Sequence, residues 1–343
     1  DEFQVVVDMP EGTSVERTAQ VLDDLSSYLA TVPEVSDYQA YAGTHSPINF
    51  NGLVRQYYLR ESPYQGEIQV NLVDKHHRER KSHEIALAVR GPLDEIGQQY
   101  NANVKIVEVP PGPPVQAPIV AEIYGLNYQG QIEVAKRVRE IFENTAGIVD
   151  IDDSVVHPAK RLVIHVDRQK AARLGVCQET IANVIAGVMG GADVGYMHGE
   201  NAKYAIPIRM ELPVADKADI DDVLALKVKC QSNELVPLSE LVEVEETTRQ
   251  VTYQHKDLLP VVYVTADMAG ELDSPLYGMF TIFGKLLQDP LANDQTIDQR
   301  LISQPDDPYF YSIKWDGEWQ ITYETFRDMG IAYAVGLILI YLL

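Results

Sequence analysis

Four aromatic residues are the side chains of this sequence best suited to binding a ligand. They lie in and beside a loop rich in Gly, Pro and Asn that extends from Gly43 to Gly52. Aromatic rings with a few polar neighbours suit the adaptable binding of amphiphilic molecules. The same rings could equally be ordinary strand and loop residues, and both interpretations stay open. The candidate cleft residues are Tyr41, Phe50, Tyr57 and Tyr58.

Side chains that could hold a metal ion are present but poorly arranged. His76 and His77 lie in a run of cations that repels a metal, and adjacent histidines point apart, so we interpret this run as solvated surface. Four methionines could bind a soft metal through their thioethers, although packing in the core is the favoured interpretation. They are Met189, Met197, Met210 and Met268. The sequence therefore predicts no metal site and no cofactor.

Motifs of catalysis are missing from the sequence. It contains no Gly-x-Gly-x-x-Gly, P-loop, Gly-x-Ser-x-Gly or His-Glu-x-x-His, so we expect no enzyme. Cys177 and Cys230 lack metal-ligand spacing. We expect Cys177 at the start of a helix and Cys230 at the end of a strand, which does not favour the short separation that a disulfide needs.

The charge of the chain restricts its partners. The 343 residues carry a formal net charge of −23, and a field of this sign repels nucleic acid and anionic lipid headgroups. It could attract cationic substrates, although a solvated acidic surface is the simpler interpretation. The length is enough for two to four domains.

The C-terminal segment predicts the start of a transmembrane helix. Residues 329–343 form an apolar run without a charge, whereas a complete span needs about 20 residues. Aromatic residues precede the run, as expected of an interfacial belt; they are Trp315, Trp319, Tyr323 and Phe326. A buried core helix is the alternative. At the other end the chain begins in a strand at Phe3–Val7, without a signal peptide.

Residues 1–109 predict a split βαβ motif. Alternating apolar residues indicate strands, and apolar residues at helical spacing indicate two helices, in the order β-α-β-β-α-β. Thr13 or Ser14 can cap the first helix. The second helix spans Ser82–Tyr100, and Gly91-Pro92 should kink or split it. The proline-rich segment 110–114 reads as a stiff connector.

The pattern then begins again and is interrupted. Ile119 repeats Val5 at an offset of 114 residues, and the helix that follows repeats the apolar spacing of the first, which indicates a duplicated element. A small α+β module of roughly 80 residues, a plausible domain size, separates the first strands of this repeat from Pro260–Thr265. The segment Asp289–Pro308 reads as a loop.

Several short motifs resemble those of resistance-nodulation-division (RND) efflux transporters. Asp167-Arg168 to Gly175, a helix ending at Gly190-Gly191, and Val236-Pro237-Leu238 resemble the family where a porter subdomain passes into the docking subdomain. The opening strand and turn, Val7–Ser14, resemble the start of a periplasmic porter domain. The resemblance covers nearly the whole chain. The residues of the docking-module motif are Asp167, Arg168, Gly175, Gly190, Gly191 and Pro237.

The resemblance implies an α+β architecture in four parts and a position in the second periplasmic loop. Residues 1–115 would form one ferredoxin-like (split βαβ) porter subdomain, and residues 116–167 with 247–320 a second one. Residues 168–246 would be the inserted docking subdomain, and residues 321–343 the start of the eighth membrane helix. The segment Glu271–Trp319 is longer than the family pattern, so its local fold is left open.

The resemblance also implies a function. The chain would be the periplasmic, substrate-translocating part of a proton-driven pump that exports small amphiphilic compounds. It would act as a homotrimer in the inner membrane, with a periplasmic adaptor protein and an outer-membrane channel. The proton-relay residues of the family lie in membrane helices outside this sequence. The alternatives are export of heavy-metal cations, and a membrane-tethered assembly or adaptor protein that uses its ferredoxin-like modules for protein contacts.

Overall fold

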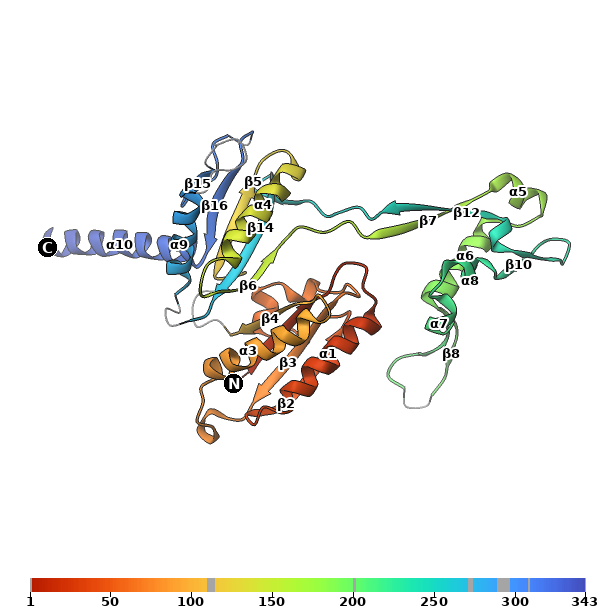
Figure 1. Cartoon of the computed structure of the whole chain (residues 1–343), viewed down its shortest axis with the longest axis horizontal. Helices are drawn as coiled ribbons and strands as arrows, with labels where there is room; N and C mark the ends of the chain where they lie inside the picture. The colour runs from red at the N-terminus through yellow and green to blue at the C-terminus, as the bar shows by residue number, and fades with distance from the viewer. Residues whose placement is uncertain are drawn as a thin grey trace. The chain divides into compact units, whose positions relative to one another are not determined.

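The computed structural model divides the chain into two units of mixed α+β structure (Figure 1). Unit 1 contains Asp1–Pro158 and Gln250–Leu343, and unit 2 contains Ala159–Arg249. The structure describes residues 2–109, 115–199, 202–270, 274–288, 297–307 and 309–342. The α+β class predicted from the sequence is confirmed, whereas the proline-rich connector at 110–114 lies outside the described residues.

The first half of unit 1, residues 2–109, is a four-stranded antiparallel sheet in the order β2-β3-β1-β4. Helices α1 and α3 cover one face (Figure 1), and apolar side chains from both helices and the sheet form its core. The Ser14 hydroxyl caps α1 by accepting the Arg17 N–H at 3.4 Å, as predicted. The elements are β1 (Glu2–Asp8), α1 (Val15–Leu29), β2 (Val35–Ala42), α2 (Phe50–Val54), η1 (Tyr57–Leu59), β3 (Gln65–Leu72), η2 (Lys75–His77), α3 (Ser82–Gln98) and β4 (Asn103–Glu108).

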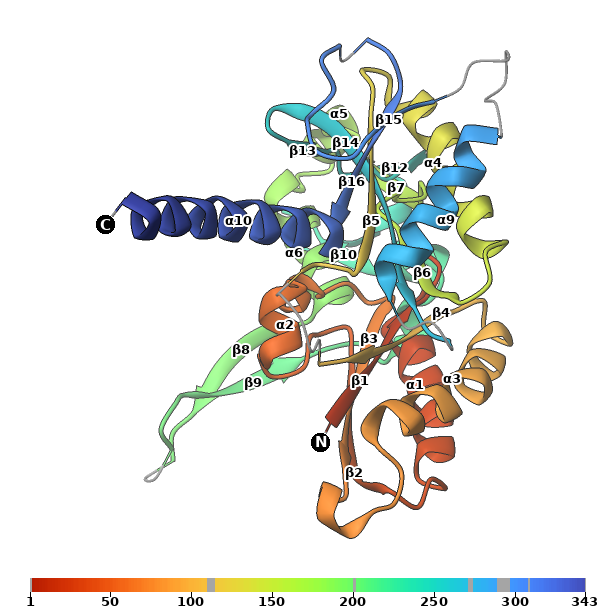
Figure 2. The same ribbon diagram turned by 90° about the vertical axis from the view of Figure 1, so that its left-hand side faces the viewer.

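The second half, residues 115–158 and 250–317, repeats this strand order. Its central strands run β6-β14-β5-β16, with β13 and β15 added at the edges, and α4 and α9 cover one face (Figure 2). The shared order agrees with the predicted repeat. The elements are β5 (Ile119–Tyr124), α4 (Tyr128–Glu143), β6 (Ile148–Asp153), β13 (Gln254–Lys256), β14 (Leu259–Met268), α9 (Pro275–Gln288), β15 (Asp298–Arg300) and β16 (Ser312–Gly317).

Three local expectations differ from the structure. Helix α3 is not split at Pro92, because packing of residues such as Val89 and Leu93 in the core outweighs the loss of one helix hydrogen bond; the kink stays a prediction. Trp315 is fully buried and stacks on Phe142 at 6.3 Å, so it is a core residue and not part of an interfacial belt. The expected loop 289–308 contains the short strand β15; residues 289–296 and 308 lie outside the described residues.

Unit 2 is built from short helices and three two-stranded sheets. Strand β7 pairs with β12 along its length. Both strands belong to unit 2, which therefore spans Ala159–Arg249 and is wider than the segment 168–246 expected from the sequence. The Arg249 N–H donates to Ala159 O at 2.7 Å, which places the two ends side by side. The elements are β7 (Lys160–Val166), α5 (Arg168–Arg173), α6 (Gln178–Gly190), β8 (Ala192–Met197), β9 (Ile206–Met210), α7 (Val214–Lys217), α8 (Ile220–Leu224), β10 (Lys227–Lys229), β11 (Leu235–Pro237), η3 (Leu238–Glu240) and β12 (Val242–Thr248).

The docking-module motif residues begin or end elements of unit 2. Asp167 caps α5, since one carboxylate oxygen accepts the N–H groups of Gln169 and Lys170 at 3.0 Å each; Arg168 is the first residue of that helix. Gly175 and Gly191, which follow α5 and α6, both have positive φ. Gly190 is the last residue of α6, and Pro237 ends β11.

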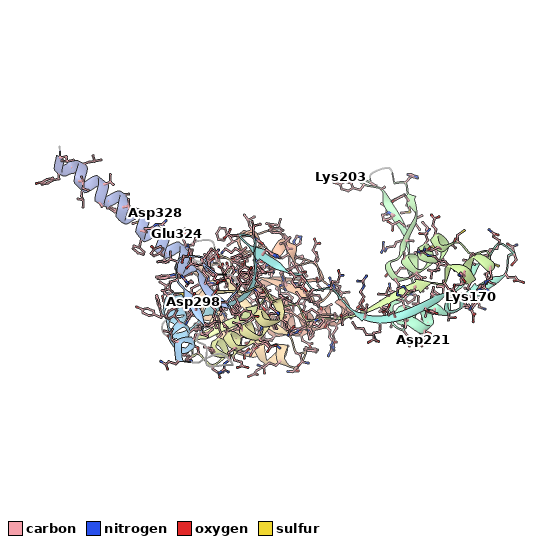
Figure 3. All side chains as sticks on the ribbon, turned by 90° about the horizontal axis from the view of Figure 1, so that it is seen from above. Lys170, Lys203, Asp221, Asp298, Glu324 and Asp328 are labelled. Atoms are coloured by element: carbon pink, nitrogen blue, oxygen red, sulfur yellow. The ribbon has the colours of Figure 1, made fainter. Side chains whose placement is uncertain are left out.

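Helix α10 (Glu318–Leu342) has the length and composition of a membrane span. The most apolar stretch of this helix is entirely unburied within the structure, which disfavours the alternative of a buried core helix. Glu324 and Asp328 lie on its first half (Figure 3), and the residues after Asp328 carry no charge. Among the preceding aromatics, Phe326 is 71% exposed, as an interfacial residue would be.

Replacing the α5 cap will loosen the start of that helix. In Asp167→Ala the exchange of the Gln169 and Lys170 amides with deuterium should rise by about fivefold, because such a cap contributes about 1 kcal/mol. Hydrogen exchange read by mass spectrometry measures this change. Asp167→Asn, which can still cap, should exchange as the wild type does; equal rates in all three proteins would show that the cap does not hold α5.

Candidate functional site

A polar cleft lies between the two halves of unit 1. One cavity, of about 590 Å³, is lined from the first half by residues such as Asp8 and Arg60 and from the second by Arg139, Asp153 and His157. Smaller cavities of about 120 Å³ and 380 Å³ follow the same contact between the halves. Ligands commonly bind in concave sites between packed elements, so this cleft is the candidate site.

Lys105 forms the centre of the contact. It lies on β4 with its side chain 10% exposed, and its ammonium donates to Asp8 on β1 at 2.7 Å. The same ammonium donates to Asp152 on β6, in the other half. A buried ammonium must be paired to be tolerated, and Lys105 is paired with one carboxylate from each half.

Arg60 fixes the other side of Asp8. Its guanidinium pairs with Asp8 at 2.9 Å and with Glu67 on β3 at 3.2 Å, and it donates to Val7 O at 2.9 Å. The side chain of Arg60 is 11% exposed and that of Glu67 is fully buried. The sheet face turned away from α1 and α3 therefore holds a group of paired charges beside the buried side chains of Val6 and Val107.

These pairs shift the ionisation of the buried groups. Burial alone would raise the pKa of Asp8, but Lys105 and Arg60 outweigh burial and hold that pKa well below its usual range. Burial alone would lower the pKa of Lys105, but Asp152 and Asp8 raise it above its ordinary value. Both groups are therefore charged at neutral pH.

A bulge in β6 completes the contact. Asp150 has φ +53° and, with Ile151, lies opposite the single residue Ala266 of β14. The Asp150 carboxylate accepts the Ile106 N–H of β4 at 3.2 Å and a donor of Arg90. An exposed strand edge has unpaired backbone donors; here a side chain of the second half pairs with one of them.

The four aromatic residues that were expected to line the cleft lie on three different elements, β2, α2 and η1. Tyr57 lines the 120 Å³ cavity beside Lys105, and burial raises the pKa of its hydroxyl. Phe50 begins α2 and is 49% exposed, and Tyr58 is 36% exposed. The Tyr41 hydroxyl on β2 donates to Gln39 at 2.6 Å. Their role in binding stays a prediction.

The charged residues of the cleft were missed from the sequence. Asp8, Glu67 and Lys105 lie in strands that also contain buried apolar residues, and a charged residue in such a strand is the signal that could have identified them. Their common location could not be read from the sequence, because the two partners of Lys105 lie 97 and 47 residues away along the chain.

The described residues contain no group of three or more His, Cys, Asp or Glu side chains placed to hold a metal ion. The prediction that the methionines pack in the core is wrong for three of them, since Met189, Met197 and Met210 are 47%, 58% and 62% exposed. They lie at the end of α6 and on the β8–β9 hairpin of unit 2. Cys177 and Cys230 are both free thiols.

Removing the Lys105 ammonium will destabilise unit 1 most at neutral pH and will flatten its response to acid. Because the folded-state pKa of Asp8 is depressed, its pairs stabilise the fold above about pH 4 and this stability is lost as the pH falls further. In Lys105→Met the pKa of Asp8 will rise toward or above its unfolded-state value, so the fold will no longer lose stability through this group as the pH falls. At neutral pH the variant should lose about 3–5 kcal/mol of unfolding free energy. Urea denaturation followed by circular dichroism at several pH values measures both.

The control is Lys136→Met, which removes a lysine of α4 whose side chain is 58% exposed. This variant should keep the wild-type pH profile, since exposed ion pairs contribute little. If Lys105→Met had the same profile as the wild type, Lys105 would not hold the two halves together.

Solved structures and curated proteins resemble this chain over parts of their length. A crystal structure of a heavy metal efflux pump has a TM-score of 0.65 and 17% sequence identity, covering 99% of this chain and 33% of that protein. A second crystal form of a heavy metal efflux pump has a TM-score of 0.66. These likenesses show that the fold is that of a region of such a pump.

Two curated relatives from Cupriavidus metallidurans show similarity in sequence. The nickel and cobalt resistance protein CnrA is 23% identical over 231 residues, which is 66% of this chain. The cobalt-zinc-cadmium resistance protein CzcA is 24% identical over 136 residues, or 38% of this chain. The matched parts span 20% and 13% of those relatives. The sequence model of the AcrB/AcrD/AcrF family matches residues 1–343, and the chain therefore belongs to this family of RND transporters.

Proposed function

We propose that this chain is part of the periplasmic portion of a proton-driven RND efflux pump, and that the cleft of unit 1 lies on the path of the substrate. The family supports transport over a role in assembly alone. The cleft supports a path because side chains of both halves line it and ion pairs join the halves across it. On this proposal the two halves are porter subdomains and unit 2 is the docking subdomain.

Heavy-metal cations are the substrate class best supported. The curated relatives are named for resistance to nickel, cobalt, zinc and cadmium, and the 590 Å³ cavity is acidic. Four carboxylates line it against two arginines; they are Asp8, Glu11, Asp152 and Asp153 against Arg60 and Arg139. An excess of negative charge concentrates cations, and carboxylate and imidazole, here of His157, are suitable metal ligands.

The cleft would bind such cations weakly. The described residues form no preassembled metal cluster, and Asp8, Asp152 and Asp153 already pair with lysine or arginine. A passing cation would therefore meet carboxylates one or two at a time. Weak binding suits transport, because the substrate must also leave.

Export of amphiphilic compounds is the second candidate function. It is favoured by the exposed apolar residues around α2, where Ile48, Phe50 and Leu53 are 64%, 49% and 63% exposed. Apolar side chains grouped at a surface commonly mark a binding site. Phe50, one of the aromatic residues that the sequence singled out, belongs to this segment.

The further parts of the pump are also proposals. Helix α10 supplies one candidate span for the inner membrane. We propose a homotrimer that works with a periplasmic adaptor protein and an outer-membrane channel, as the family resemblance implies. Unit 2 is the part proposed to meet the channel.

Removing one carboxylate from the cavity wall should weaken metal transport. Glu11 lines the cavity, and its carboxylate accepts the backbone N–H of His157 at 3.3 Å. In Glu11→Gln the concentration of Ni²⁺, Co²⁺, Zn²⁺ or Cd²⁺ needed for half-maximal transport should rise by about two- to tenfold, since a nearby unit charge contributes roughly 1 kcal/mol. Uptake into proteoliposomes that contain the full-length protein measures this.

The matched control is Glu16→Gln, an exposed residue of the α1 first turn, which removes the same charge away from the cavity and should transport as the wild type. If the wild type transports none of the four cations, export of metals is excluded. If it transports them and Glu11→Gln changes nothing, the cavity is not on the path.

Removing the exposed ring of Phe50 should distinguish export of amphiphilic compounds from export of metal cations. Phe50→Ala should reduce export of bulky amphiphiles by up to tens-fold, because burying such a ring against a ligand contributes about 1–3 kcal/mol. Metal transport and protein abundance should not change, since Phe50 is 49% exposed. Tyr38→Ala, at an exposed ring on β2, is the control, and drug-susceptibility assays are the readout. Unchanged susceptibility to every amphiphile would exclude this role for the α2 segment.

A further inference from the structure

The second sheet of unit 1 contains a separate group of buried charges, on the face turned away from α4 and α9. Residues of β16 alternate, so that Trp315 enters the core while its two neighbours lie on the opposite face. This group, the Glu122 cluster, consists of Glu122 on β5, Lys256 on β13, and Lys314 and Asp316 on β16. The side chains of Glu122 and Lys314 are 1% and 6% exposed.

Glu122 and Asp316 share their lysine partners. Lys256 donates to Asp316 at 2.5 Å and to Glu122 as well. Lys314 lies 3.5 Å from Glu122 and 3.7 Å from Asp316. The other titratable groups that face the cluster are Tyr124, whose hydroxyl donates to Glu122 at 2.8 Å, Tyr263 and Asp257.

The first sheet shows that a second carboxylate is not required by the fold. Asp8 of β1 matches Glu122 at the repeat offset of 114 residues. Lys105 pairs with Val6 in the first sheet, and Asp316 pairs with Val120 in the second. Equivalent positions therefore hold a carboxylate and an ammonium in one sheet but two carboxylates in the other. Two neighbouring carboxylates favour a single shared proton.

The cluster is joined directly to the start of α10. The Asp316 carboxylate accepts the Gly317 N–H at 2.8 Å, and the Glu318 N–H, the first of α10, donates to Pro118 O at 3.0 Å. Gly317 has φ +80°, and a Cβ there would lie 2.5 Å from Pro118 O, so this turn is tight. A change in charge at Asp316 would act on the residue that precedes the helix.

We propose that the Glu122 cluster is a proton-binding site, and that loading its proton on Glu122 loosens the joint between β16 and α10. When Glu122 is protonated, Lys256 loses one of its two carboxylate partners, and Asp316 accepts the shared proton from Glu122, so that it accepts the Gly317 N–H less strongly. The proton passes from water to one Glu122 oxygen, and no other bond is broken. Proton binding at Glu122 does not depend on which compound the protein transports.

The electrostatics agree with this geometry. Burial raises the pKa of Glu122, and the hydrogen bond with Asp316 raises it further, although Lys256 and Lys314 act in the opposite direction. Burial would also raise the pKa of Asp316, but Glu122 and Lys256 lower it to about 2. As the pH falls, the first proton therefore goes to Glu122 and not to Asp316.

Infrared titration of the full-length protein in lipid nanodiscs tests the site. A band of a protonated carboxyl should appear as the pH falls while the pH is still above the range in which ordinary glutamates, with a pKa of about 4.3, become protonated. It should vanish in Glu122→Gln and persist in Glu140→Gln, which alters a glutamate of α4 whose side chain is 56% exposed. A band that Glu122→Gln leaves intact, or the absence of such a band in the wild type, would overturn the proposal.

Two further variants distinguish a proton site from a structural role. Lys256→Gln should move the titration midpoint up by about one pH unit or more, and Asp316→Asn should move it down, because each removes a charge that acts on Glu122. Deuterium exchange at residues 316–320 should quicken on acidification beyond the intrinsic change, and Glu122→Gln should abolish this response. The proposal would be contradicted if the titration midpoints of the two variants did not move in opposite directions. It would also be contradicted if exchange at residues 316–320 quickened equally in Glu122→Gln and the wild type.

Discussion

The ammonium of Lys105, 10% exposed between Asp8 and Asp152, is the constraint on which unit 1 depends. A buried charge is costly unless its partners stay in place, and the two partners come from different halves of the unit. Apolar packing would tolerate sliding of one sheet past the other, whereas these pairs and the Asp150 bulge define one arrangement. The same contact leaves polar cavities on either side instead of a sealed core, so the interaction that joins the halves also creates the cleft.

The two sheets of unit 1 share one strand order but hold different groups of charged residues. In the first half the charged face of the sheet turns to the other half, where Asp8 and Arg60 belong to the cleft. In the second half the charged face holds Glu122 and Asp316 and leads into α10. Because the ladders are equivalent, the difference between the halves lies in a few side chains and not in the fold. On the proposals above, the charges around Asp8 would respond to the separation of the halves, and the Glu122 cluster would respond to protonation.

The sequence predicted what depends on local patterns. Periodic apolar residues located the main helices and strands of the first half and the opening strand and helix of the second, Ser14 was identified as a possible cap, and the apolar run from Met329 identified α10. Membership in a transporter family also confirms that the chain is not an enzyme. Trp315 was misplaced because an aromatic residue before an apolar run looks the same in a core strand and at a membrane surface. The ion pairs of Lys105 and Glu122 were missed because single charges in a strand have no period and their partners are distant along the chain.

The central claim is that charge pairs between Lys105 and both halves keep the cleft of unit 1 in one state. Spin labels at Gln20 on α1 and Glu133 on α4, both outside the cleft, would report the separation of the halves by electron–electron resonance in the full-length protein. The account predicts one narrow distance distribution for the wild type at neutral pH, and an added, longer population when Lys105 is replaced by Met. Identical distributions in the two proteins would contradict it.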